Sequence, residues 1–361
     1  MAVTSPRPIL ELDEDNLASY LDGRGLARPG DDVVVRRLSG GYVNNVFRAE
    51  IGRREPAPGG AALPPKVLVL KQSLEAAQRT VLSAGIGRAL VEVAAMKAIT
   101  GLLGGDAPIP TIVDDDPHNY VSIMTPAPDG ARLYDTELLA GRFHPGTGRR
   151  LGTYAGHLHA RTEGRADLAA AFADNPGFAL RDQSIRSAAA AHPDLAGVID
   201  GALHRNRAEA RVLVDADITP KNVLVHASGV TKLDFECTQW GHPALDVGII
   251  VAHFVLPGFA RPQSWDALLA EAAACYAAYA ALRPEAGSAA FAADVALYAA
   301  LMMLGRADGA LVFDYLVPHR PRLRTLATAL CAAPSTIDEI LTLAAGSAPT
   351  VRTPPGPTDR R

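Results

Sequence analysis

Hydrophobic residues, many of them β-branched, gather in short runs separated by polar and turn-forming residues over the first third of the chain, a pattern typical of β-strands. Residues 33–50 contain two such runs joined by a Gly/Asn turn, which predicts a β-hairpin. A third run lies at 67–71, and the Gly-, Pro- and Ala-rich residues 53–65 before it predict a surface loop. From 73 to 103 the apolar positions share one helical face, so we expect a helix there.

The pattern changes after two more strand-like runs, at 111–113 and 120–124. A Pro-Ala-Pro-Asp-Gly segment at 126–130 is followed by Ala- and Leu-rich stretches with helical spacing. We predict helices at about 133–163, 184–211, 264–281 and 286–305. The β-type runs in this part are short and lie at 212–214, 223–225 and 230–234.

Together these patterns predict an α+β fold with two lobes. The N-terminal lobe, residues 1–125, would contain a small antiparallel sheet and one helix. The C-terminal lobe, residues 126–345, would be larger and mainly helical, with short strands on either side of a polar loop. The tail at 346–361 is rich in Pro, Thr and Arg and is predicted to be disordered.

Composition narrows the class of protein. Hydrophobic residues make up 48% of the 361 positions, enough for a substantial core, and the net charge is only -4. Because no basic block or basic stripe is present, we expect no nucleic-acid partner and no membrane partner. We recognise no secretory signal and no stretch of transmembrane length, so we expect a cytoplasmic protein. Three widely spaced cysteines fit neither a zinc site nor a disulfide framework.

The candidate catalytic and metal-binding residues lie in and just after the polar loop of the C-terminal lobe. Asp217 and Asn222 are five positions apart with Pro220 between them, so both side chains can point into one cleft. Asp234 follows on the next β-turn unit. A carboxylate can orient a substrate hydroxyl, and an amide and a second carboxylate can bind Mg2+ through oxygen. The same residue types also form ordinary turns, but the strands on either side and the Leu-Asp-Phe-Glu run at 233–236 favour function.

This stretch resembles the catalytic and metal loops of the aminoglycoside phosphotransferase and choline kinase superfamily, and the segment 240–248 is similar to the one that follows them. The resemblance implies a bilobal protein-kinase-like fold that uses ATP and Mg2+. It implies that Asp217 is the catalytic residue and that Asn222 and Asp234 bind the metal. Asp246 resembles the aspartate that braces the catalytic loop.

The resemblance extends to the N-terminal lobe. Lys71 resembles the lysine that binds nucleotide phosphates, and Glu92 resembles its ion-pair partner. Taken singly, they could equally be a charge at a strand edge and a carboxylate on a helix surface. Gly40 and Gly41, with Asn45, are placed like a flap over the phosphates, although a plain hairpin turn explains them as well.

The segment at 123–127 is placed like the kinase hinge. There Met124 would guard the inner pocket, and the Thr125 carbonyl and Ala127 N–H would bind adenine. An ordinary linker between lobes is the alternative.

The sequence departs from the family at one informative place. Asp215-Ala216-Asp217 stands where the family has His-Gly-Asp. An extended backbone would aim both carboxylates to one side, which raises the proton affinity of the pair unless a cation intervenes. Lys221, an arginine or Mg2+ could supply that charge. We therefore predict that activity persists with an altered pH optimum.

The leading hypothesis is an ATP-dependent phosphotransferase acting on a hydroxyl of a small molecule, such as an aminoglycoside, a choline-like compound, a sugar or another metabolite. The alternative is a catalytically silent, nucleotide-binding pseudokinase-like protein, for which Asp215 is the main argument. A protein kinase is a weaker alternative because only about a dozen residues separate Asp234 from Asp246. The sequence does not identify the acceptor. A substrate cleft lined by Asp and Glu would favour a cationic acceptor, whereas arginines such as Arg161 or Arg181 would favour an acidic one.

Overall fold

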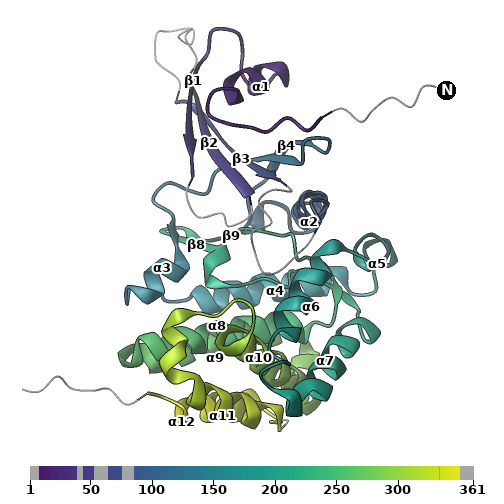
Figure 1. The fold of residues 1–361 in the computed structure, drawn as a ribbon, viewed down its shortest axis with the longest axis vertical. Coiled ribbons are helices and arrows are strands. Elements are labelled where there is room, and N and C mark those ends of the chain that lie inside the picture. The colour runs from purple at the N-terminus through teal and green to yellow at the C-terminus, as the bar shows by residue number, and fades with distance from the viewer. Residues whose placement is uncertain (1–7, 39–43, 53–63, 75–84, 333, 350–361) are drawn as a thin grey trace, which may run out of the picture.

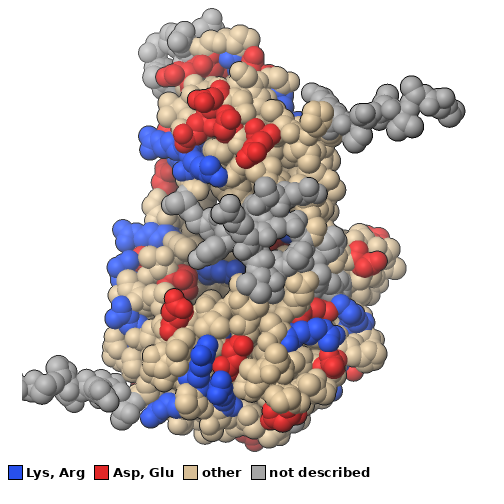
Figure 2. Space-filling model, in the orientation of Figure 1, with Lys and Arg blue, Asp and Glu red and all other residues tan. Residues whose placement is uncertain are grey.

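The structure is a computed structural model that describes residues 8–38, 44–52, 64–74, 85–332 and 334–349. An antiparallel sheet forms the N-terminal part and helices form most of the C-terminal part (Figure 1), so the predicted α+β class is confirmed. On the face in Figure 2, acidic and basic side chains are interspersed, as the small net charge suggests.

The N-terminal sheet has five antiparallel strands in the order β1-β2-β3-β5-β4. The strands are β1 (Asp32–Arg37), β2 (Asn44–Gly52), β3 (Lys66–Ser73), β4 (Ile112–Asp116) and β5 (Val121–Met124). Alternate residues of β2 are buried, because one face of the sheet packs against α1 (Leu17–Gly23). Each of the five strands coincides with a run recognised in the sequence.

Helix α2 (Arg88–Leu103) links the two parts of the molecule. Its buried residues Met96, Ile99 and Leu103 join the core of the C-terminal helices and not the core under the sheet. The helix begins later than the sequence indicated: Ser73 still belongs to β3, and residues 75–84 lie outside the described residues.

The C-terminal part contains ten α-helices among the described residues. They are α3 (Tyr134–Leu139), α4 (Thr147–Thr162), α5 (Ala166–Phe172), α6 (Pro176–Arg186), α7 (Ala196–Ala208), α8 (Ala244–Ala260), α9 (Trp265–Ala280), α10 (Ala289–Asp308), α11 (Arg320–Cys331) and α12 (Ile337–Gly346).

Two helices predicted as continuous are each interrupted. The predicted helix at 133–163 divides into α3 and α4, because Pro145 is followed by Gly146 with φ 82°. The predicted helix at 184–211 divides into the end of α6 and α7, because Pro193 starts a separate 3-10 turn. No helix was predicted where α8 lies, because the apolar run there shows little helical periodicity.

Five short strands position the polar loops. They are β6 (Arg132–Leu133), β7 (Val212–Val214), β8 (Val223–His226), β9 (Gly229–Lys232) and β10 (Gln239–Gly241). The loop 215–222 leaves β7 and enters β8, and the loop 233–238 leaves β9 and enters β10. Because β7 pairs with β10 and β8 with β9, the two loops lie side by side.

Helices α8 and α10 form the centre of the C-terminal core. Nearly every residue of α8 is buried. Helix α10 has the length and apolar composition of a membrane span, which the sequence reading overlooked, but 78% of that window is buried inside the protein. Its apolar surface is therefore explained by packing against α8 and α11.

Glycines let α4 approach α9 closely. A Cβ added at Gly148 would lie 2.0 Å from the Glu271 carbonyl oxygen, and one at Gly152 would lie 2.1 Å from the Cys275 carbonyl oxygen. These contacts are backbone atoms, so a side chain at either position must move a whole helix.

We predict that Gly152→Ala destabilises the fold by about 1–3 kcal/mol or more, because α4 and α9 must separate. Gly101→Ala in α2 is the matched control: nothing lies within 4 Å of its added Cβ. The control should be neutral or stabilise by up to about 1 kcal/mol. Urea unfolding of both variants measures the difference, and equal effects would refute close packing as the cause.

Candidate active site

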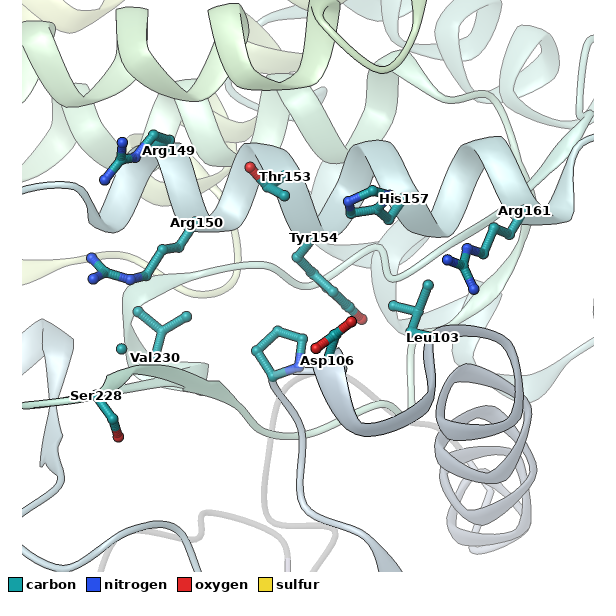
Figure 3. Close-up of a pocket in the computed structure, with 12 residues that line it drawn as sticks. Leu103, Asp106, Arg149, Arg150, Thr153, Tyr154, His157, Arg161, Ser228 and Val230 are labelled. Atoms are coloured by element: carbon teal, nitrogen blue, oxygen red, sulfur yellow. The ribbon is translucent and has the colours of Figure 1, made fainter.

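A cavity of about 380 Å³ lies between α4, the end of α2 and the β8–β9 turn (Figure 3). It is lined by Arg149, Arg150, His157 and Arg161 of α4, among others. None of the predicted catalytic, nucleotide or metal residues lines it. Arg161, named above as a possible acceptor contact, therefore belongs to this separate cavity.

The loop 215–222, which contains the predicted catalytic residue, is fixed by Asp246 in the first turn of α8. Its carboxylate accepts the Asp215 N–H at 2.9 Å and the Ala216 N–H at 2.7 Å. His159 Nε2 lies 3.0 Å from the same carboxylate, and both residues are fully buried. Asp246 thus has the bracing geometry that the family resemblance implies, and His159 is a satisfied packing residue.

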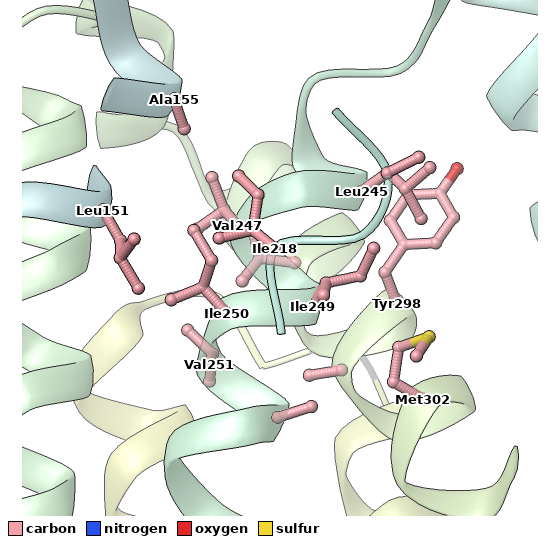
Figure 4. Packing of buried hydrophobic residues seen from close by; sticks show 14 of the residues in the cluster. Leu151, Ala155, Ile218, Leu245, Val247, Ile249, Ile250, Val251, Tyr298 and Met302 are labelled. Atoms are coloured by element: carbon pink, nitrogen blue, oxygen red, sulfur yellow. The ribbon is translucent and has the colours of Figure 1, made fainter. Parts of the chain in front are cut away.

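The loop adopts a backbone conformation that favours glycine. Ala216 has φ 61°, in the left-handed region, where a Cβ costs roughly 1–2 kcal/mol. The two hydrogen bonds from Asp246 hold this turn, and Ile218 anchors it by packing into the core beside α8 (Figure 4). The glycine of the family's His-Gly-Asp motif falls at this position, so the strain explains why that motif has one.

Asp217 emerges from this turn with both carboxylate oxygens occupied. Its Oδ1 accepts from Arg181 Nη2 at 2.5 Å, and its Oδ2 accepts from Asn222 Nδ2 at 2.7 Å. Burial alone would raise the pKa of Asp217, but the Arg181 guanidinium and the Lys221 ammonium outweigh it and hold the pKa well below its ordinary range. Asp217 is therefore ionised at neutral pH.

A second cluster joins the sheet to the C-terminal loops. Lys71 Nζ of β3 lies 2.8 Å from Glu92 Oε1 of α2 and 2.9 Å from Asp234 Oδ1. Burial lowers the pKa of Lys71, but the two carboxylates more than compensate and raise it overall. Asp234 has φ 67°, a strained conformation often found at functional sites.

The two clusters meet through the backbone, because the Leu233 N–H donates to the Asn222 carbonyl at 2.8 Å. Lys71, Glu92, Asp217, Asn222 and Asp234 thus form one connected site.

Asn222 and Asp234 fit a magnesium site by the chemistry of their donors. Mg2+ prefers oxygen ligands and commonly takes only one or two from the protein, the rest being phosphates and water. Among the described residues, no group of three or more His, Cys, Asp or Glu suited to a metal occurs. Glu236 lies two positions after Asp234 in sequence but pairs with Arg88 at 2.8 Å, and burial raises its pKa to about 7.

The remaining nucleotide candidates differ in what the structure shows. Gly40 and Gly41 lie outside the described residues. The side chain of Asn45 accepts a hydrogen bond from Arg37. Met124 is buried at the end of β5, and the Thr125 N–H donates to the Thr111 carbonyl. Ala127 is partly exposed in the segment between the two parts.

The prediction that Asp215 and Asp217 point to one side is wrong, because the left-handed Ala216 between them breaks the extended alternation. Asp215 Oδ1 lies 2.9 Å from Lys232 Nζ, and its Oδ2 accepts from Tyr154 at 3.0 Å. The compensating cation is thus Lys232, which the sequence reading missed. The sequence signal that could have identified this cation was a lysine within the β-type run at 230–234.

Lys232 ties the two loops together. Its Nζ also donates to the Leu233 and Asp234 carbonyls, at 2.7 and 2.8 Å, and lies 4.4 Å from the centre of the Phe235 ring. Both Lys232 and Asp215 are fully buried. Burial raises the pKa of Asp215, and the Lys232 ammonium limits the rise.

Comparison with known proteins identifies the family to which the chain belongs. A model of the phosphotransferase enzyme family matches residues 34–284, more than half of the chain. The chain therefore belongs to the phosphotransferase enzyme family, and the resemblance to aminoglycoside phosphotransferases and choline kinases is confirmed. Among curated proteins, none matches the chain.

Solved structures share the fold at low sequence identity. Choline kinase from Cryptosporidium parvum Iowa II is 11% identical, with a TM-score of 0.51, and the match covers 93% of this chain and 94% of that one. Ethanolamine kinase from Plasmodium vivax is 12% identical, with a TM-score of 0.50 and coverage of 94% and 90%. An amicoumacin kinase in complex with AMP-PNP, Ca2+ and Ami is 12% identical, with a TM-score of 0.50 and coverage of 90% and 96%. The family model thus gives a phosphotransferase, and these structures show that the fold is shared.

We predict that Lys232→Met destabilises the protein by about 3–5 kcal/mol, because it leaves the buried Asp215 carboxylate without its cation. In the double variant Asp215→Asn/Lys232→Met, the loss should fall short of the sum of the single losses by at least about 1 kcal/mol. Urea unfolding measures all three. The control is Lys66→Met, an exposed lysine at the start of β3, with an expected change within about 0.5 kcal/mol. Additive losses would contradict the pairing.

Proposed function

We propose that the protein is an ATP-dependent phosphotransferase that moves the γ-phosphoryl group of ATP to a hydroxyl of a small molecule. One observation carries the proposal. Lys71, held by Glu92, bonds to Asp234, whose loop is hydrogen-bonded to the Asp217–Asn222 loop. A silent relative would have no need of this complete arrangement.

The proposed roles follow from the chemistry of each group. Lys71 would bind the nucleotide phosphates, and Asn222 and Asp234 would hold Mg2+, which neutralises phosphate charge when bound. Gly40, Gly41 and Asn45 would cover the phosphates. Met124, Thr125 and Ala127 would receive the adenine. The amicoumacin kinase, whose structure is a complex with AMP-PNP and Ca2+, supports a nucleotide and a divalent cation here as well.

In the proposed reaction, the acceptor oxygen forms a bond to the γ-phosphorus, and the bond from that phosphorus to the β–γ bridging oxygen breaks, which releases ADP. The hydroxyl proton passes to Asp217 and then to solvent. Because the pKa of Asp217 is held low by Arg181 and Lys221, its main task is to orient the hydroxyl, which suits a transfer that needs little proton abstraction.

We also place the protein in the cytoplasm, where ATP and Mg2+ are supplied. All three cysteines, Cys237, Cys275 and Cys331, are free thiols, which suits a reducing compartment.

We predict that Asp217→Ala lowers ATP-dependent turnover by about 10²–10⁴-fold while ATP and Mg2+ still stabilise the protein in a thermal shift. Asp234→Ala should instead abolish that stabilisation by ATP and Mg2+, because it removes a proposed metal ligand. Asp200→Asn, which changes an exposed carboxylate of α7 that pairs with Arg186, is the control for both and should match the wild type. Full turnover in Asp217→Ala would refute the catalytic role of Asp217. If the wild-type protein binds ATP without any turnover, the pseudokinase-like alternative is favoured.

A further inference from the structure

Arg306, in the last turn of α10, is a buried charge without a counterion among the described residues. Its exposed fraction is 2%, and its guanidinium carbon lies 4.9 Å from the centre of the Phe313 ring. Its Nε has no hydrogen-bond partner, and no carboxylate of the described chain lies within ion-pair distance. A guanidinium in this situation is costly, and burial and the nearby Arg181 lower its pKa to about 10.

Arg306 belongs to the surroundings of the proposed catalytic carboxylate. Met302 lies one helical turn before it, and the Met302 sulfur is 3.7 Å from Arg181 Nη1. Arg181 in turn bonds to Asp217. The Asp217 carboxylate acts electrostatically on Arg306 and raises its pKa, in opposition to burial.

Four cations act electrostatically on the Asp217 carboxylate: Arg181, Lys221, Lys232 and Arg306. Arg181 is 4% exposed, and its Nε also has no hydrogen-bond partner in the described chain. Lys221 and Arg306 both act on the carboxyl of Asp135 in α3 and lower its pKa, in opposition to burial. The Asp217 carboxylate is bonded to Arg181 and Asn222, and within the described chain neither it nor Asp135 forms an ion pair with Arg306.

An acceptor must reach Asp217, which is itself only 7% exposed. Any molecule whose hydroxyl contacts Asp217 therefore comes close to Arg181 and to the side of α10 that carries Met302 and Arg306. A cationic acceptor would meet two guanidiniums there, whereas an anionic acceptor would supply the missing counterion.

We propose that the acceptor is an anionic alcohol, with a carboxylate or phosphate group bound by Arg306 beside Arg181 while its hydroxyl faces Asp217. This inference rests on the proposed phosphotransferase activity and names its substrate class. The anionic group is bound and not consumed: the hydroxyl oxygen alone forms the new bond to phosphorus.

The substrate class is tested with [γ-32P]ATP and a small-metabolite extract separated by ion exchange at neutral pH into anionic, neutral and cationic fractions. Label should pass to the anionic fraction. Single compounds then identify the anionic group that is recognised. Glycerate and gluconate test a carboxylate, and glycerol 3-phosphate and ribose 5-phosphate test a phosphate. Choline, ethanolamine and kanamycin form the cationic arm. Transfer to the cationic or neutral fraction alone overturns the inference and leaves the proposed function intact. No transfer to any fraction, although ATP binds, overturns the proposed function itself.

The role of Arg306 is tested on the acceptor identified by the labelled fraction. Arg306→Met should raise the KM for the acceptor about tenfold or more, with the KM for ATP unchanged, and Arg306→Lys should recover part of the loss. Arg186→Gln, an exposed arginine of α6, is the matched control and should behave as the wild type.

Thermal unfolding separates binding from a structural role. If Arg306 is kept for its ligand, removing an unpaired buried charge should leave Tm unchanged or raise it by about 2–4 °C. A lowered Tm together with an unchanged acceptor KM would show that Arg306 serves the fold, and would overturn the proposal.

Discussion

The carboxylate of Asp246 is the contact on which the rest of the site depends. It is fully buried at the start of α8 and accepts two backbone N–H groups of the catalytic loop. Those hydrogen bonds hold Ala216 in a left-handed conformation that it would not otherwise favour. The direction in which Asp217 leaves the loop follows from that turn, so the core helix determines where the proposed catalytic carboxylate points.

The site is built from charges that would be costly to bury singly. Asp215 with Lys232 and Asp217 with Arg181 each join two segments that are distant in sequence, and Lys71 with Asp234 joins the sheet to the helical part. Pairing makes burial tolerable, and the same pairs fix the relative positions of the loops. The exception is Arg306, which has no ion-pair partner among the described residues and for which we proposed an anionic acceptor.

The sequence predicted the fold class and all five strands of the N-terminal sheet, because short β-type runs bounded by turn residues are a local signal. It located the loops of Asp217, Asn222 and Asp234 because their turn residues and spacing are local features. Helix boundaries were less accurate: Pro145, Gly146 and Pro193 divided helices that Ala- and Leu-rich composition had suggested were continuous.

The sequence by itself determined the types and order of the chemical groups, since these are properties of the chain. Only the tertiary structure decided their partners. Asp215 could have faced Asp217, Lys221 or a metal, and the strained turn at Ala216 directs it to Lys232 instead. Contacts across long sequence separations depend on how the elements pack, and packing rests on many weak interactions that no local pattern records.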